Sequence, residues 1–174
     1  MNEGYEKTFV VDDEAVMLNM FEFSDVQQYT GLASVYIRAA EGFMLVYSIT
    51  SRSSFEQVQI LQRRIRVMGK EYYPMVLIGN YSTRATEREV SVIEGKKLAS
   101  EFGCRFVEID HENSLNVVRA FEVLVRELRE HKKAEGVAGL TTPSAEETPH
   151  TVKGQRWRQT LAAFTNRWSF KRKT

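Results

Sequence analysis

The stretch Pro74–Thr83, PMVLIGNYST, decides the fold of this 174-residue chain. Met75–Ile78 is a short, continuous apolar run that Gly79 closes, which is typical of a strand buried on both faces of a parallel sheet. In open α/β sheets, ligand-binding residues lie just beyond the carboxyl ends of the strands. Asn80–Thr83 follows at such an end, so we expect a functional site here.

Strands and helices alternate along the rest of the chain. Apolar or alternating runs predict further strands at residues 8–11, 16–22, 42–49 and 105–109, with a polar turn at residues 12–14 between the first two. Helical spacing of apolar residues predicts helices near residues 35–37, from a capping box at Ser53–Glu56 to Gly69, from a second box at Thr86–Glu89 to Gly103, and over Val117–Leu128 to about His131. Such alternation predicts an α/β fold with a largely parallel sheet.

Composition excludes several classes of protein. The chain is 43% apolar and 27% charged, as in ordinary globular domains. It has no run of about 18 apolar residues that could span a membrane and no apolar signal core at its start, so we expect a cytoplasmic protein. Cys104 is the only cysteine, so a disulfide framework within one chain is excluded and a small buried apolar role is expected.

The charges are divided unevenly. Residues 151–174 carry seven of the 24 bases and none of the 23 acids, which leaves the rest of the chain with a net charge of −6. Residues 134–150 are rich in glycine, proline and small polar side chains, which is typical of a linker. We therefore divide the chain into a domain at 1–133, a flexible linker at 134–152 and a basic tail at 153–174.

The tail has the pattern of an amphipathic helix. Trp157, Leu161, Phe164 and Trp168 recur at i, i+4, i+7 and i+11, on one helical face. The bases around this face are Arg156, Arg158, Arg167, Lys171, Arg172 and Lys173. A basic helix with aromatic anchors suits an anionic membrane surface, here the inner face of the plasma membrane. The alternatives are packing on its own domain, a protein partner or an acidic polymer.

The order of the elements resembles the Ras/Rap branch of the small GTPases over about Tyr5 to His131. The segments GFMLVYSITSRSSFEQV, PMVLIGN, FVEI and AFEVLVRELREHK carry this resemblance, because they occur in the family's order and at its intervals. It implies a P-loop NTPase-like, Ras-like sheet with flanking helices. The chain ends in Lys-Arg-Lys-Thr, without the Cys-a-a-X of many members, so we expect no prenylation.

The phosphate-binding part of that family is not recognisable here. The resemblance implies that a first strand, a phosphate-binding loop and a first helix precede Tyr5. The sequence has no Gly-x-x-x-x-Gly-Lys-[Ser/Thr], whose backbone amides and lysine hold the phosphates. We therefore expect a Ras-like domain that lacks its first strand and first helix and has no cofactor, followed by the basic tail helix.

The second switch is altered as well. The family's Asp-Thr-Ala-Gly-Gln-Glu-Glu-Tyr corresponds to residues 22–29, EFSDVQQY. Glu22 keeps a carboxylate with one more methylene, and Asp25 puts a negative charge where a glycine amide meets the γ-phosphate. Val26 stands at the position of the glutamine that orients water and cannot do so, which leaves no catalytic residue.

The residues at the family's guanine-binding positions are also changed, in ways that disfavour nucleotide binding. Asn80-Tyr81-Ser82-Thr83 resembles Asn-Lys-x-Asp, with Tyr81 in place of the lysine and Thr83 in place of the carboxylate that pairs with guanine. The family's Ser-Ala-Lys reads Asp110-His111-Glu112, which adds negative charge near the base. The vestigial nucleotide site therefore comprises Glu22, Asp25, Asn80, Tyr81, Thr83, Asp110 and His111.

Simpler roles stand beside these assignments. Asn80 can turn the chain after Gly79, and Glu22 with Asp25 can form a solvated strand end rather than a metal pair. His111 lies between two acids on a loop, where adjacent side chains diverge, so we predict no metal site and no acid–base cluster.

The sequence supports three hypotheses. The first is a nucleotide-binding-deficient pseudo-GTPase that acts in signalling through protein or membrane contacts, with no nucleic-acid partner. The second is a truncated version of a GTPase that binds GTP, GDP and Mg²⁺ and hydrolyses GTP, although truncation does not explain Asp25, Val26, Tyr81 and Thr83. The third is a decayed gene product, which the maintained helical spacing disfavours.

The gap in the sheet leads to a prediction about folding. By the resemblance, the missing strand lies between residues 16–22 and 42–49, so its loss leaves two unpaired strand edges and a partly bare sheet face beside Phe121 and Leu124. The two strands can pair directly, another chain can pair with them, or the tail can cover the gap. We predict a marginal or self-associating chain whose tail helix partly shields the exposed face.

Overall fold

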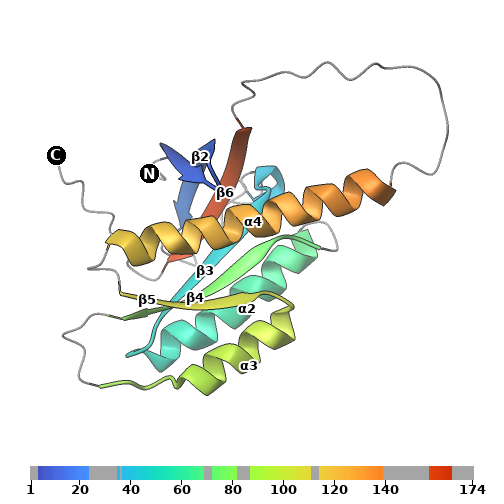
Figure 1. Ribbon diagram of the computed structural model, residues 1–174. Coiled ribbons are helices and arrows are strands. Elements are labelled where there is room, and N and C mark those ends of the chain that lie inside the picture. Colours follow the sequence, from blue (N-terminus) through green and yellow to red (C-terminus); the bar gives the residue numbers. More distant parts are fainter. Residues whose placement is uncertain are drawn as a thin grey trace, which may run out of the picture.

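The structure is a computed structural model that describes residues 4–23, 35, 37–68, 72–81, 87–110, 114–138 and 157–165. Its centre is one sheet of six described strands, flanked by helices (Figure 1). The strands are β1 (Gly4–Val11), β2 (Glu14–Phe23), β3 (Gly42–Ser48), β4 (Met75–Tyr81), β5 (Arg105–Asp110) and β6 (Trp157–Thr165). They lie in the order β1-β2-β6-β3-β4-β5. Every strand predicted over the domain is present, with ends shifted by a few residues.

The first two strands form the only antiparallel pair among the described strands. Asp12 and Asp13 connect them with φ angles of 53° and 63°. Two successive left-handed residues make a type I′ turn, whose twist matches that of paired strands, and aspartate is among the residues that tolerate it. The polar turn predicted at residues 12–14 is thus confirmed as a tight hairpin.

The three principal helices are α2 (Arg52–Met68), α3 (Val92–Phe102) and α4 (Ser114–Ala138). Both predicted capping boxes are misplaced. The Ser51 hydroxyl accepts the Ser54 N–H at the start of α2, two residues before the predicted cap at Ser53. The capping box of α3 is Ser91 with Glu94, and residues 87–89 are not helical.

The predicted C-terminal end is correct for α3 and too early for α4. Gly103 ends α3 in the left-handed conformation, with φ of 69°, as predicted. Helix α4 continues past the predicted end near His131 to Ala138. The predicted linker therefore begins too early, because residues 134–138 are still helical. Residues 139–152, the rest of that linker, lie outside the described residues.

The helices cover opposite faces of the sheet (Figure 1). On one face, Phe43, Leu45 and Leu77 pack against apolar residues of α2 and α3. On the other, Met44, Val46 and Val76 pack against α4. Successive residues of a strand point to opposite faces, so β3 and β4 must be apolar throughout to serve both layers. This explains why GFMLVYSI and MVLI are continuous apolar runs.

Helix α4 also covers the N-terminal hairpin. Leu18 of β2 is fully buried in the same cluster as Phe121 and Leu124 of α4, and the rings of Phe9 and Phe121 stack with centroids 5.1 Å apart. The predicted bare face beside Phe121 and Leu124 is therefore wrong for these described strands. A single helix of 25 residues is long enough to cross the strands on this face.

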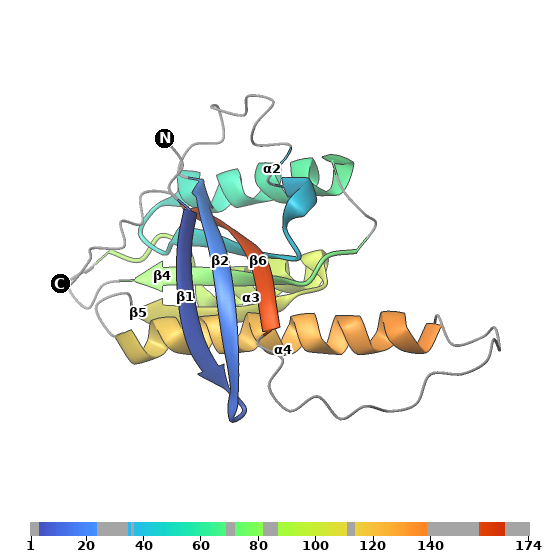
Figure 2. The same ribbon diagram turned by 90° about the horizontal axis from the view of Figure 1, so that it is seen from above.

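The tail differs most from expectation. Trp157–Thr165 is not a helix but β6, which lies between β2 and β3 and is parallel to both (Figure 2). The predicted amphipathic helix is therefore wrong over Trp157, Arg158, Leu161 and Phe164. The other predicted contact residues, namely Arg156, Arg167, Trp168, Lys171, Arg172 and Lys173, lie outside the described residues.

The position of β6 between β2 and β3 explains how the two strand edges in the middle of the sheet are paired. Residues Val16–Phe23 of β2 align with Trp157–Phe164, and residues Gly42–Val46 of β3 align with Leu161–Thr165. The tail thus fills the gap by pairing with both strand edges instead of shielding a face. The ladder satisfies backbone groups that would otherwise be unpaired in the middle of the sheet.

Candidate functional site

The candidate site lies at the carboxyl-terminal edge of the sheet. Strands β2, β6, β3, β4 and β5 run parallel, so their carboxyl ends meet at this edge. β2 ends beside Glu22, β3 ends at Ser48, β4 ends at Asn80 and Tyr81, and β5 ends at Asp110. Ligands of open parallel sheets bind at such edges.

The strand register brings three of the predicted residues together. Asn80 aligns with Ser48 on one side and Ile109 on the other, and Tyr81 aligns with Asp110. The Asn80 carbonyl accepts the Ile49 N–H at 3.0 Å. Because β4 continues through Asn80 to Tyr81, Asn80 is a strand residue, and its predicted role as a turn residue is wrong.

Asn80 also carries an unusual side chain. Its Oδ1 atom is buried and has no hydrogen-bond partner in the structure, which places it among three such atoms in the described part of the chain. Buried polar atoms are nearly always paired, because an unpaired one loses its hydration without compensation. The neighbouring Asp110 is also buried, with 7% of its surface exposed. The edge therefore combines a carboxylate with an unused amide oxygen, neither of which attracts an anion.

Hydroxyl groups fix the loop that leaves β3. The Ser54 hydroxyl accepts the Ser48 N–H at 2.9 Å and donates to the Ser51 carbonyl at 2.8 Å. The hydroxyls of Ser48 and Thr50 lie 2.9 Å apart. In these contacts the polar groups of the loop are hydrogen-bonded to one another. The run SITSRSS signals such local hydrogen bonding, although its serines predicted only a helix cap at Ser53.

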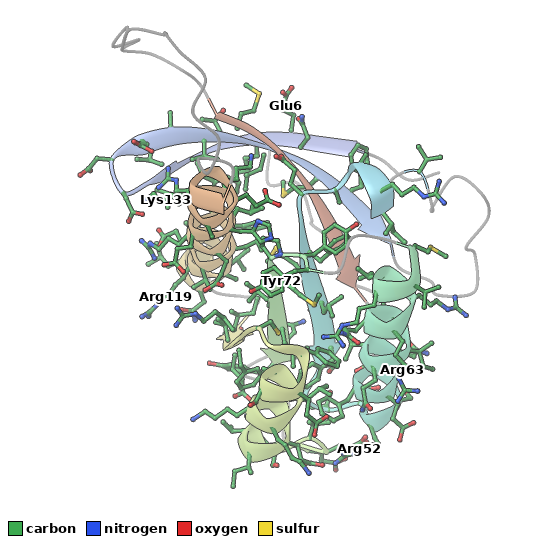
Figure 3. All side chains as sticks on the ribbon, turned by 90° about the vertical axis from the view of Figure 1, so that its right-hand side faces the viewer. Glu6, Arg52, Arg63, Tyr72, Arg119 and Lys133 are labelled. Carbon is green, nitrogen blue, oxygen red and sulfur yellow. The ribbon has the colours of Figure 1, made fainter. Side chains whose placement is uncertain are left out.

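An ion-pair network joins the beginnings of α2 and α3. Arg52, labelled in Figure 3, donates from Nη1 to Glu94 Oε1 at 2.6 Å, and its second terminal nitrogen reaches the Glu89 carbonyl. Glu94 also accepts from the Ser91 amide and hydroxyl. These hydrogen bonds, that from Arg52 first, lower the pKa of Glu94 from 4.5 to about 2. Sequence reasoning missed this network because its partners lie on different elements.

Tyr47 is the second buried group without a partner. Its hydroxyl finds no hydrogen-bond partner in the structure, and its ring packs edge-on against Phe55 at 4.9 Å. Burial raises the pKa of this phenol, and the Glu108 carboxylate adds to the effect. A Cβ atom on Gly95 would lie 2.5 Å from the Tyr47 hydroxyl and 2.5 Å from Phe106 Cζ. Gly95 is therefore required by close packing between α3 and the sheet.

The remaining predicted site residues have no described side chains. Asp25, Val26, Thr83 and His111 lie outside the described residues, and of Glu22 only the backbone within β2 is described. Among described side chains, no three His, Cys, Asp or Glu residues gather in a geometry suited to a metal ion. Nor is any described helix long and apolar enough to cross a membrane.

Comparison with known proteins identifies the family. A sequence model of the Ras family matches residues 1–130. A Ras-like protein of Laccaria bicolor is 42% identical over 134 residues, which are 76% of this chain and 64% of that protein. The protein named ras-1 of Neurospora crassa is 37% identical over 137 residues, which are 78% of this chain and 64% of that protein.

The chain belongs to the Ras family of small GTPase-like proteins, and the resemblance seen in its sequence is confirmed. Its α/β sheet with helices on both faces agrees with the Ras-like fold. The chain spans 64% of the length of these two relatives.

Proposed function

We propose that this chain is a signalling protein of the Ras family that acts by binding partners and neither binds nor hydrolyses guanine nucleotide. One observation carries the proposal. β6 occupies the position between β2 and β3 where the family resemblance puts the strand that leads into the phosphate-binding loop. A strand supplied from elsewhere would have to displace β6 from both of its neighbours.

The sequence at the end of β6 supports the same proposal. Residues 166–169, which follow β6, read Asn-Arg-Trp-Ser. They contain no glycine, whereas a loop that wraps phosphates with successive amides depends on glycine to bring its backbone close. β6 therefore takes the place of the strand without supplying the loop.

The edge residues add unfavourable chemistry for a guanine nucleotide. Asp110 is buried there, and Asp25 adds a second acid in the sequence of the altered switch. Tyr81 and Thr83 replace the lysine and the carboxylate that the resemblance leads one to expect. Without the paired acceptors of that carboxylate, a guanine edge loses its discriminating contact. Val26 supplies no group that could orient a water molecule for hydrolysis.

The alternative is an N-terminally truncated form of a protein that binds GTP and hydrolyses it. In that case the family's first strand and loop belong to a longer chain, and β6 gives way to them. This alternative predicts nucleotide binding once the missing segment is restored. The substitutions at Asp25, Val26, Tyr81 and Thr83 argue against it, because they lie within the present chain.

We also propose that the basic tail contacts an anionic membrane surface from the cytoplasmic side. Seven bases and no acid over residues 151–174 give the electrostatic attraction, and Trp168, which follows β6 in the sequence, suits the interface. Protein partners in Ras-like signalling remain part of the proposal, because the chain belongs to the Ras family.

A titration with fluorescent GDP and GTP in the presence of Mg²⁺ tests the central proposal. We expect no saturable binding of either nucleotide up to about 10 μM. The variant Tyr81→Lys/Thr83→Asp restores the base-binding residues and should still fail to bind, because the phosphate loop is missing. Saturable binding by the unaltered chain below about 10 μM, roughly −7 kcal/mol, would overturn the proposal.

A further inference from the structure

A hollow lies between helix α4 and the segment that leads into β4. Its volume is about 440 Å³, and it is lined by Tyr72, Glu127, Glu130, His131, Ala134 and Glu135. The five helical residues have the spacing i, i+3, i+4, i+7 and i+8, which places them on one face of α4. Because α4 continues to Ala138, its last turns supply Ala134 and Glu135 to this face. Hollows of this size hold small ligands or single side chains.

Two aromatic rings form one wall of the hollow. The centroids of Tyr72 and His131 lie 5.1 Å apart, with an angle of 15° between the ring planes, so the rings stack. Tyr72, labelled in Figure 3, is 57% exposed although it is a large aromatic residue. The ring is thus held in place by His131 and is still accessible to a ligand. The face of an accessible aromatic ring attracts cations, and guanidinium groups in particular.

Three carboxylates surround the aromatic wall. Glu127 Oε1 accepts from Arg105 Nε at 2.6 Å, and Glu135 Oε2 lies 3.6 Å from His131 Nδ1. Glu130 is exposed and forms no salt bridge with any residue that the structure describes. The hollow therefore combines an aromatic face with acceptors that are not all neutralised by the chain itself.

We propose that this hollow binds an arginine side chain of a basic protein partner. A planar guanidinium stacks on the Tyr72 ring, and its N–H groups donate to the carboxylates of Glu130 and Glu135. A lysine ammonium is a point charge without a plane to stack, so it fits less well. Residues 1–150 carry a net charge of −6, which attracts a basic partner over a longer range. This binding mode rests on the proposed function, because it requires that the chain acts through partners.

The experiment follows the amide NMR spectrum of the full chain during titration with three short peptides. The first is acetyl-Gly-Ser-Arg-Ser-Gly-amide, and the others carry lysine or citrulline in place of arginine. Citrulline has the shape of arginine without its charge. We expect the arginine peptide to shift the amide signals of Tyr72, His131 and Ala134 with a Kd of about 1 mM. The lysine peptide should bind about threefold more weakly, and the citrulline peptide should show no saturation up to about 10 mM.

Two variants test the aromatic and the acidic part of the hollow separately. Tyr72→Leu keeps an apolar side chain and removes the aromatic face, so it should weaken binding of the arginine peptide about threefold. Glu130→Gln removes a charge at nearly constant size and should also weaken binding about threefold. Glu101→Gln, an exposed change on α3, alters the net charge equally and should leave binding unchanged. The amide signals of β4 and β5 show whether each variant is folded.

Saturable binding of the arginine peptide that Tyr72→Leu and Glu130→Gln weaken and Glu101→Gln does not would support the assignment. Equal binding of the arginine and citrulline peptides, unchanged binding by folded Tyr72→Leu, or an equal loss in the two glutamine variants would overturn it. Shifts that do not saturate up to about 10 mM arginine peptide would overturn it as well. The titration with GDP and GTP judges the proposed function separately, because the hollow adjoins the amino-terminal end of β4 and the candidate site lies at its carboxyl end.

Discussion

Met20 of β2 and Leu161 of β6 are direct register neighbours in parallel strands, although they come from opposite ends of the chain. Met20 is buried in the core that α4 covers. The middle of the sheet therefore depends on residues that follow every other described element in the sequence. Contacts of such long sequence separation slow folding, because closing a long loop costs chain entropy.

The first prediction concerns this central strand. Leu161 aligns with Met20 on one side and Gly42 on the other. Leu161→Pro removes a backbone donor and fixes φ in the interior of a sheet, where each unpaired group costs about 1–3 kcal/mol. We expect a clear fall in the thermal unfolding temperature. Ser169→Pro, placed after β6, is the matched control and should change stability by less than about 0.5 kcal/mol.

Equal stability of the two proline variants would mean that β6 does not hold the sheet together in solution. Size-exclusion chromatography of the Leu161→Pro variant adds a second readout. Loss of β6 leaves the inner edges of β2 and β3 unpaired, and we expect this variant to self-associate.

The second prediction uses two helical glycines. A Cβ at Gly95 would lie 2.5 Å from both Tyr47 and Phe106, whereas a Cβ at Gly136 in α4 would meet nothing within 4 Å. Gly95→Ala should therefore destabilise the protein by about 1–3 kcal/mol through overpacking. Gly136→Ala should stabilise it by up to about 1 kcal/mol, because alanine favours helices. Chemical denaturation measures both, and a neutral Gly95→Ala would contradict the packing.

The third prediction is a pH dependence. Because the pKa of Glu94 falls from 4.5 in the unfolded chain to about 2 in the folded state, its ion pair stabilises the fold fully above pH about 4.5. That contribution is lost as the pH drops from about 4.5 towards about 2. Glu94→Gln should be less stable than the unaltered chain at pH 7, and the difference should vanish across this window.

Thermal unfolding from pH 7 to pH 2 measures this difference. Glu101→Gln, an exposed change on the same helix, controls for the altered net charge. A gap between the unaltered chain and Glu94→Gln that stays constant down to pH 2 would refute the assigned role of Arg52 and Ser91.

The fourth prediction concerns the thiol. Burial raises the pKa of Cys104 from 9.0 to about 11. Since only the thiolate reacts, alkylation by iodoacetamide at pH 8 should be about 100-fold slower in the folded protein than in urea-unfolded protein. Mass spectrometry over time measures both rates. Similar rates would show that Cys104 is open to solvent. This test bears on its predicted role as a small buried residue, because Cys104 packs against the α2–α3 core but is only partly buried.

Parts of the site could be read from the sequence and parts could not. The family resemblance assigned Asn80, Tyr81 and Asp110 to one site, and the strand register places them side by side, since Tyr81 aligns with Asp110. The unpaired Asn80 Oδ1 was not foreseen, since it depends on what the fold leaves within reach of the amide. The caps at Ser51 and Ser91 were missed because several serines and acids offer similar local patterns, and only the final path of the chain selects among them.

The sequence by itself determined the class of fold. Continuous apolar runs at residues 42–49 and 74–79 require burial on both faces, and the helical spacing after Ser53 and around Phe121 requires layers to cover them. Tertiary structure alone decided the role of Trp157–Thr165. Its local pattern favours a helix, but two unpaired strand edges in the middle of the sheet offer backbone partners on both sides. Local propensity is weak compared with the cost of leaving those backbone groups unpaired, so the sheet overrides the pattern and takes the tail as its central strand.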